Sequence, residues 1–103
     1  MARAKYFVVW SADADNDLVE VWQFLVTEES PRVAIGKVRE IARACDMLET
    51  RPLLVGRSRD KLCPGMRSLL VRPYVIFYRI AGRTVEIVRV LHGRRDIDEH
   101  LFE

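Results

Sequence analysis

The chain has 103 residues, of which 50% are hydrophobic and 31% are charged. Two halves of such a chain would each be too small to bury a useful core, so we expect one domain over residues 1–103. The composition excludes a disordered chain, and no apolar run approaches the roughly 18 to 20 residues that span a bilayer. Because residues 1–10 also lack a signal-peptide pattern, we expect a cytoplasmic protein with no membrane partner.

Charge is distributed unevenly along the chain. Residues 1–50 carry six Lys or Arg and nine Asp or Glu, a net charge of −3, and residues 96–103 carry −4. Residues 51–95 carry eleven basic and two acidic side chains, a net charge of +9, and ten of the eleven are arginine. Arginine suits bidentate contacts and interface anchoring, so this basic block favours a binding face for phosphate or carboxylate over a merely solvated surface.

The first half of the sequence predicts a strand and two helices. Lys5–Trp10 is a β-branched and aromatic run that ends at a polar cluster, which indicates a strand. Ser11 is a candidate N-cap for a helix over residues 12–28, whose apolar stripe consists of Ala14, Leu18, Val21, Trp22 and Leu25. Ser30 and Pro31 begin a second helix with the stripe Ala34, Val38, Ile41, Cys45 and Leu48. The short connection predicts an antiparallel helical hairpin.

The second half predicts a loop followed by a β-meander. Pro52–Gly65 has loop composition, with two Pro and two Gly. Strands are expected over residues 66–71, 74–80 and 84–91, joined by tight turns at Arg72-Pro73 and Gly82-Arg83. The fold class is therefore α+β, in the order β-α-α-β-β-β, with the hairpin packed on one face of the sheet. For the acidic tail we expect few contacts.

Pairing across the two turns predicts which residues share a face of the sheet. Val71 opposite Tyr74 and Ala81 opposite Thr84 would place Arg89 beside Ile76 and Val90 beside Val75. In this register both faces are largely apolar. The helices would cover one face, and the other would form an apolar patch of the kind that commonly marks a partner site.

Catalytic and metal-binding motifs are absent from the sequence. There is no glycine-rich phosphate loop, paired metal-ligand spacing or Gly-x-Ser-x-Gly elbow, and we expect neither a metal nor a cofactor. Cys45 and Cys63 are most simply free thiols. His92, at the end of the last strand, is either a general acid or base for RNA cleavage or an ordinary packed residue.

Three segments resemble the ParE branch of the RelE/ParE toxin superfamily: Gly65–Ser68, Tyr74–Arg79 and, most specifically, Ile87–Asp96, supported by the loop Gly56–Leu62. The likeness covers nearly the whole chain. It implies the toxin of a bacterial toxin–antitoxin module, held in a hetero-oligomer by a ParD-like antitoxin whose extended C-terminal segment wraps the toxin. ParE-like toxins are associated with inhibition of DNA gyrase, whereas RelE-like relatives cleave mRNA in the ribosome.

The resemblance also separates these two activities at particular positions. RelE-like nucleases usually place a catalytic arginine on the middle strand, after the aromatic residue that follows the turn, and here that position is Val75. Valine cannot stabilise a pentavalent phosphate. The C-terminal Tyr or His-Tyr of the nucleases is replaced by Leu101-Phe102-Glu103, although Arg95 matches a basic position that they share. We therefore favour a gyrase inhibitor that is not an enzyme, with a ribosome-dependent endoribonuclease or a non-toxic complex-forming homologue as alternatives.

Two sets of candidate binding residues follow. Target contacts are expected from the basic block and the neighbouring imidazole, namely Arg67, Arg89, His92, Arg94 and Arg95. Antitoxin contacts are expected from apolar anchors on the helical hairpin and the sheet, with arginine at the rim, namely Trp22, Leu25, Val75, Phe77 and Arg79. Buried apolar anchors usually dominate an interface, and exposed charge pairs contribute only about 0 to 1 kcal/mol each.

Overall fold

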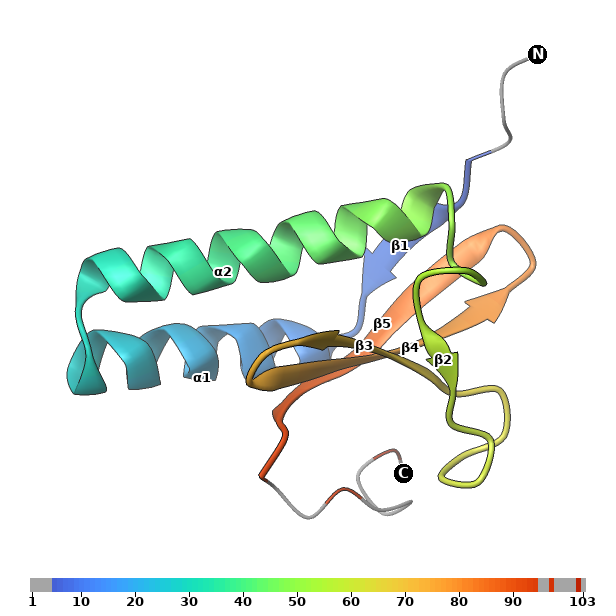
Figure 1. Ribbon diagram of the computed structural model, residues 1–103. Helices are drawn as coiled ribbons and strands as arrows, with labels where there is room; N and C mark the ends of the chain where they lie inside the picture. The colour runs from blue at the N-terminus through green and yellow to red at the C-terminus, as the bar shows by residue number, and fades with distance from the viewer. Residues whose placement is uncertain (1–4, 95–96, 98–101, 103) are drawn as a thin grey trace.

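A five-stranded sheet carries two helices on one face (Figure 1). The computed structural model describes residues 5–94, 97 and 102. Its elements are β1 (Phe7–Trp10), α1 (Ala12–Glu28), α2 (Pro31–Asp46), the 3-10 helix η1 (Met47–Glu49), β2 (Arg57–Ser58), β3 (Arg67–Val71), β4 (Tyr74–Ala81) and β5 (Thr84–His92). The predicted α+β class and order of elements are confirmed, with β2 as an addition. No helix in this described part of the chain is long and apolar enough to cross a membrane.

Both helices begin where the sequence predicts. The Ser11 hydroxyl accepts a hydrogen bond from the Ala14 N–H at 3.0 Å, and the Ser30 hydroxyl accepts one from the Val33 N–H at 3.1 Å. Pro31 occupies the first turn of α2, where its missing N–H leaves no bond unmade. The two helices run antiparallel beside each other over the sheet (Figure 1).

The strand order β1-β5-β4-β3-β2 makes the sheet mixed. β1 pairs in parallel with β5, and the remaining neighbours pair antiparallel. β2 contributes only two residues at one edge, within the segment that the sequence predicts to be loop. Gly82 adopts a φ of +60° in the β4–β5 turn, a conformation that glycine tolerates and most residues do not.

The predicted register is correct for β3 and β4 but wrong for part of β5. Tyr78 pairs with Ile87 as expected, but Phe77 pairs with Arg89, so Val88 is an extra residue in the ladder. This β-bulge shifts the following pairs by one residue. Val90 consequently lies opposite Ile76 and packs under the helices, rather than beside Val75 on the other face.

The sheet separates two hydrophobic clusters. The inner cluster lies between the sheet and the helices, and its fully buried members include Ile41, Leu48, Ile76, Tyr78 and Ile87. The outer cluster lies on the opposite face and consists of Met66, Val75, Phe77, Val88 and Leu91. Leu62, Cys63, Ile97 and Phe102 pack against the outer cluster. The expectation of a tail with few contacts is therefore wrong for Ile97 and Phe102, because their apolar side chains cover Phe77 and its neighbours.

Candidate functional site

The bulge in β5 is held by polar groups of α1 and its cap. The Ser11 N–H donates to the Ile87 carbonyl at 3.0 Å, and the Ser11 hydroxyl donates to the Val88 carbonyl at 2.8 Å. Asp17, on the next turns of α1, accepts the Val90 N–H at 2.9 Å. The backbone groups that the bulge removes from the β-ladder therefore find partners on the helix, as buried polar groups require.

Asp17 also forms a largely buried ion pair with Arg89. Its carboxylate accepts two hydrogen bonds from the guanidinium, at 2.8 Å from Nε and 2.9 Å from Nη2. The hydrogen bond with Asp17 is the main cause that raises the pKa of Arg89, and burial acts in the opposite direction. We call Ser11, Asp17 and Arg89 the α1 clamp. It fixes α1 against the end of β5, where a cavity opens.

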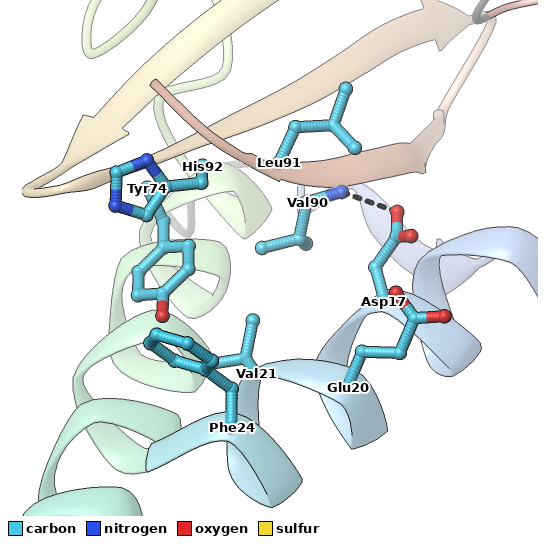
Figure 2. Close-up of a pocket in the computed structure, with 8 residues that line it drawn as sticks. All are labelled: Asp17, Glu20, Val21, Phe24, Tyr74, Val90, Leu91 and His92. Carbon is cyan, nitrogen blue, oxygen red and sulfur yellow. Dashed lines mark hydrogen bonds between the residues drawn. The ribbon is translucent and has the colours of Figure 1, made fainter. Parts of the chain in front are cut away.

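A cavity of about 350 Å³ lies between α1 and the ends of β4 and β5 (Figure 2). Its walls are mostly apolar and aromatic, and Asp17 and Glu20 stand along one side. The lining residues are Asp17, Glu20, Val21, Phe24, Tyr74, Val90, Leu91 and His92. Figure 2 shows the Tyr74 hydroxyl directed towards the Phe24 ring, so aromatic groups from two elements face the same space. Such a cavity can accept an apolar side chain of a partner protein.

His92 is held at the rim of this cavity. Its ring packs edge-on against Tyr74 with centroids 5.5 Å apart, and its Nδ1 accepts the Arg94 N–H at 3.0 Å. Because Nδ1 acts as an acceptor, the neutral ring carries its proton on Nε2. Burial raises the pKa of Tyr74. This arrangement anchors the end of β5 and presents Arg94 to solvent.

The predicted target-binding residues lie in different places. Arg67 donates from Nη2 to the carbonyls of Leu53 and Gly56, at 3.1 and 2.9 Å, and so holds the loop before β2. Arg89 belongs to the α1 clamp. His92 and Arg94 lie together at the end of β5, and Arg95 falls outside the described residues. The structure thus brings two of the five together and gives two others internal partners.

The predicted antitoxin-binding residues are also divided. Trp22 is exposed on α1, whereas Leu25 packs against the inner cluster. Val75 and Phe77 are buried in the outer cluster. Arg79 is exposed and its Nε forms an ion pair with Glu86 at 2.9 Å, as the predicted cross-strand pairing implies.

A second cavity lies beside β2 and is basic. It has a volume of about 330 Å³ and is lined by Val55, Gly56, Arg57, Arg59, Ser68, Leu70 and Val75. The Arg59 Nε donates to the Ser68 hydroxyl at 2.8 Å. Burial and, secondly, the charge of Arg57 lower the pKa of Arg59. Among residues 5–94, 97 and 102, no group of three or more His, Cys, Asp or Glu side chains is placed to hold a metal ion.

Comparison with known proteins identifies the family. Residues 8–97 match the family model described as the ParE toxin of the type II toxin–antitoxin system parDE. The chain belongs to the ParE toxin family. Toxin ParE1 of Mycobacterium tuberculosis is 35% identical over 92 residues, covering 88% of this chain and 93% of that protein. Toxin ParE3 of Caulobacter vibrioides is 31% identical over 94 residues, covering 91% and 93%.

Solved structures show the same fold. A chain of the chromosomal ParDE toxin–antitoxin system from P. aeruginosa superimposes with a TM-score of 0.74 at 24% identity, covering 84% of this chain and 95% of its own. A chain of the toxin–antitoxin complex RelBE2 from Mycobacterium tuberculosis gives a TM-score of 0.62 at 30% identity, covering 85% and 98%. The resemblance to the RelE/ParE superfamily predicted from the sequence is confirmed.

Two features of this ParE toxin were not predicted from the sequence. Asp17 is not among the residues singled out from the sequence, although its spacing from Ala14 and Val21 places it on the buried face of α1. This helical spacing is the signal in the sequence that could have identified Asp17 as a buried residue. Arg57 and Arg59 were counted in the basic block without a role, because nothing local indicates that both line one cavity.

Proposed function

We propose that this ParE toxin inhibits DNA gyrase in the cytoplasm and is neutralised by a ParD-like antitoxin in a hetero-oligomer. Membership of the ParE family supports the toxin class. The P. aeruginosa neighbour belongs to a ParDE system, and the Mycobacterium tuberculosis neighbour is part of a toxin–antitoxin complex. These likenesses favour an antitoxin as the partner of this chain.

Val75 is the observation that favours gyrase inhibition over RNA cleavage. It is only 8% exposed and lies in the outer cluster, at the position where the RelE-like pattern has a catalytic arginine. Its apolar side chain offers no charge to a reacting phosphate. Arg67 and Arg89 do not replace that arginine, because their guanidinium groups hold a loop and the α1 clamp.

Of the predicted target-binding arginines that the structure describes, Arg94 is the one whose side chain remains available. It is exposed at the end of β5, directly after the anchored His92. Within the described part of the chain, no hydrogen bond or ion pair engages its guanidinium. A charged side chain on a rigid strand end suits recognition, because little conformational entropy of the backbone is lost on binding.

The solvent-exposed face of α1 is the surface that we expect the antitoxin to bind. Three large apolar side chains of this helix are strongly exposed: Val19 at 54%, Trp22 at 42% and Phe24 at 56%. Phe24 also borders the cavity of Figure 2. Exposed aromatic side chains beside a cavity are typical anchors of protein interfaces.

The target is tested by assaying the purified chain in parallel for inhibition of gyrase supercoiling and for cleavage of mRNA on translating ribosomes. We expect loss of supercoiling with intact mRNA. Arg94→Ala should weaken inhibition at least tenfold, whereas Arg32→Ala, which removes an exposed arginine of α2, should change it less than twofold. Cleaved mRNA with normal supercoiling would instead establish the ribonuclease. A chain inert in both assays that still binds the antitoxin would indicate a non-toxic homologue.

The antitoxin surface is tested by measuring affinity for the antitoxin that rescues growth. Trp22→Ala and Phe24→Ala should each weaken binding at least tenfold, which corresponds to about 1.4 kcal/mol. Gln23→Ala, an exposed neighbour on the same helix, is the matched control and should stay within twofold. Equal effects from all three variants would remove the apolar anchors from the interface.

A further inference from the structure

The basic cavity beside β2 lies on the side of the sheet that the helices leave uncovered. Leu70 pairs with Val75, and Ser68 pairs with Phe77. Cross-strand partners share a face, and Val75 and Phe77 belong to the outer cluster, so these β3 side chains also point away from the helices. The cavity is therefore separate from the one at α1.

Within residues 5–94, 97 and 102, no acidic side chain is paired with either arginine of this cavity, Arg57 or Arg59. Asp60 is close in sequence, but its carboxylate accepts the Ser58 hydroxyl at 2.8 Å and the Gly65 N–H at 2.7 Å. The Ser68 hydroxyl meanwhile orients Arg59 through Nε, which leaves the two terminal nitrogens of that guanidinium without a hydrogen-bond partner in this region. Two arginines that line one cavity, one of them oriented by Ser68, favour an oxyanion as ligand.

The rest of the cavity is apolar and selects among oxyanions. Leu70 is 54% exposed, and Val55 and Val75 line the same space. A nucleic-acid backbone would pair with the arginines but leave the exposed Leu70 side chain in water. A carboxylate carried beside an apolar side chain on a polypeptide uses both features, because it neutralises the arginines and covers the exposed leucine.

We propose that this cavity binds the carboxylate of a Glu or Asp side chain in an acidic, amphipathic segment of a partner protein, with a neighbouring apolar side chain of that segment packed on Leu70 and Val75. The antitoxin is the expected carrier, and that identity alone rests on the proposed function. The chemistry of the cavity does not, since it follows from Arg57, Arg59 and the apolar lining.

The test uses fluorescein-labelled peptides of 12 residues. Glu and Leu alternate in one segment of the peptide, and Gly and Ser make up the rest. A peptide with Gln in place of Glu is the charge control, and a single strand of twelve thymidine nucleotides is the phosphate control. We expect the Glu peptide to bind at least tenfold more tightly than the Gln peptide. The double variant Arg57→Gln/Arg59→Gln should abolish this difference. Arg32→Gln/Arg39→Gln, which makes the same charge change on exposed positions of α2, should keep it.

Methyl NMR of the unchanged protein provides a readout that does not depend on a variant folding. The Glu peptide should shift the Val55, Leu70 and Val75 methyl signals and leave those of Val21 and Val90, at the other cavity, in place. The proposal would be overturned if the peptide shifted the Val21 and Val90 signals instead. It would also be overturned if the single variant Arg57→Gln bound the Glu peptide as tightly as the unchanged protein does. Tighter binding of the oligonucleotide through the same arginines would replace it with a nucleic-acid site. Growth arrest and supercoiling assays test the proposed function, whereas the peptide and NMR experiments test the cavity. The failure of one proposal can therefore be distinguished from the failure of the other.

Discussion

The two faces of the sheet bury apolar side chains in different ways. On the inner face, two full helices cover the core, and the α1 clamp, in which Asp17 pairs with Arg89 at 2.8 Å, ties α1 to β5. On the outer face, a loop and two tail residues cover a smaller cluster, and neither Arg57 nor Arg59 forms an ion pair with another residue that the structure describes. The helix-covered side therefore pairs its charges within the protein, whereas the opposite side exposes arginine charge and the apolar side chain of Leu70.

The largest expected effect comes from breaking the α1 clamp. Asp17→Ala removes the carboxylate that pairs with the largely buried Arg89 side chain and the acceptor of the Val90 N–H. Removing one member of a buried ion pair typically costs about 3 to 5 kcal/mol, and we expect a loss in this range in urea denaturation. Glu28→Gln, at an exposed position of the same helix, is the control and should change stability by less than about 0.5 kcal/mol. Similar stability of the two variants would show that the clamp is dispensable.

Two glycine substitutions compare a crowded position with an open one. An alanine Cβ at Gly56 would collide with the Tyr78 hydroxyl and the Ser68 carbonyl, whereas one at Gly36 in α2 would meet nothing within 4 Å. Gly56→Ala should therefore destabilise the protein by about 1 to 3 kcal/mol. Gly36→Ala should stabilise it by about 0.4 to 1 kcal/mol through helix propensity and the unfolded state. Thermal unfolding measures both, and a destabilising Gly36→Ala would contradict the open environment.

Few residues cover the outer cluster, so we expect a smaller loss of stability from replacing Phe102, which packs against it. Phe102 packs edge-on against Phe77 with ring centroids 5.1 Å apart and remains partly exposed. Phe102→Ala should cost about 1 kcal/mol, within the usual range for an aromatic pair, and should increase binding of the dye ANS to the uncovered cluster. Phe102→Leu should recover most of both changes. Unchanged ANS binding in Phe102→Ala would mean that Phe102 does not shield the outer cluster.

The smallest expected effect concerns thiol reactivity, because it leaves stability unchanged near neutral pH. Burial, with a lesser contribution from Asp46, raises the pKa of the Cys45 thiol to about 12. The thiolate is the reactive form, so at pH 8 a disulfide reagent should label the partly exposed Cys63 quickly and Cys45 only after the protein opens. Since the raised pKa favours the protonated thiol in the folded state, stability should fall as pH rises from about 9 towards 12. Rapid labelling of Cys45 in Cys63→Ser would contradict this burial.

Local physics made much of the fold predictable from the sequence. The limits of α1 and α2 follow from Ser11, Ser30 and Pro31, whose side chains act within one helical turn. The turns at Arg72-Pro73 and Gly82-Arg83 likewise depend on neighbouring residues, so the pairing of β3 with β4 was correct. The family resemblance rested on contiguous segments, which a sequence preserves directly.

Tertiary structure decided the features that join distant parts of the chain. The bulge at Val88 depends on Ser11 and Asp17, more than seventy residues away, because their side chains satisfy the backbone groups that the bulge frees. Because Arg89 pairs with Asp17, it belongs to the α1 clamp, whereas the sequence predicts it as a target-binding residue. Arg57 and Arg59 line the same cavity as Ser68 and Leu70 because β2 pairs with β3. Sequence spacing reports which side chains share a local face, but which charges meet a partner depends on how separate elements pack.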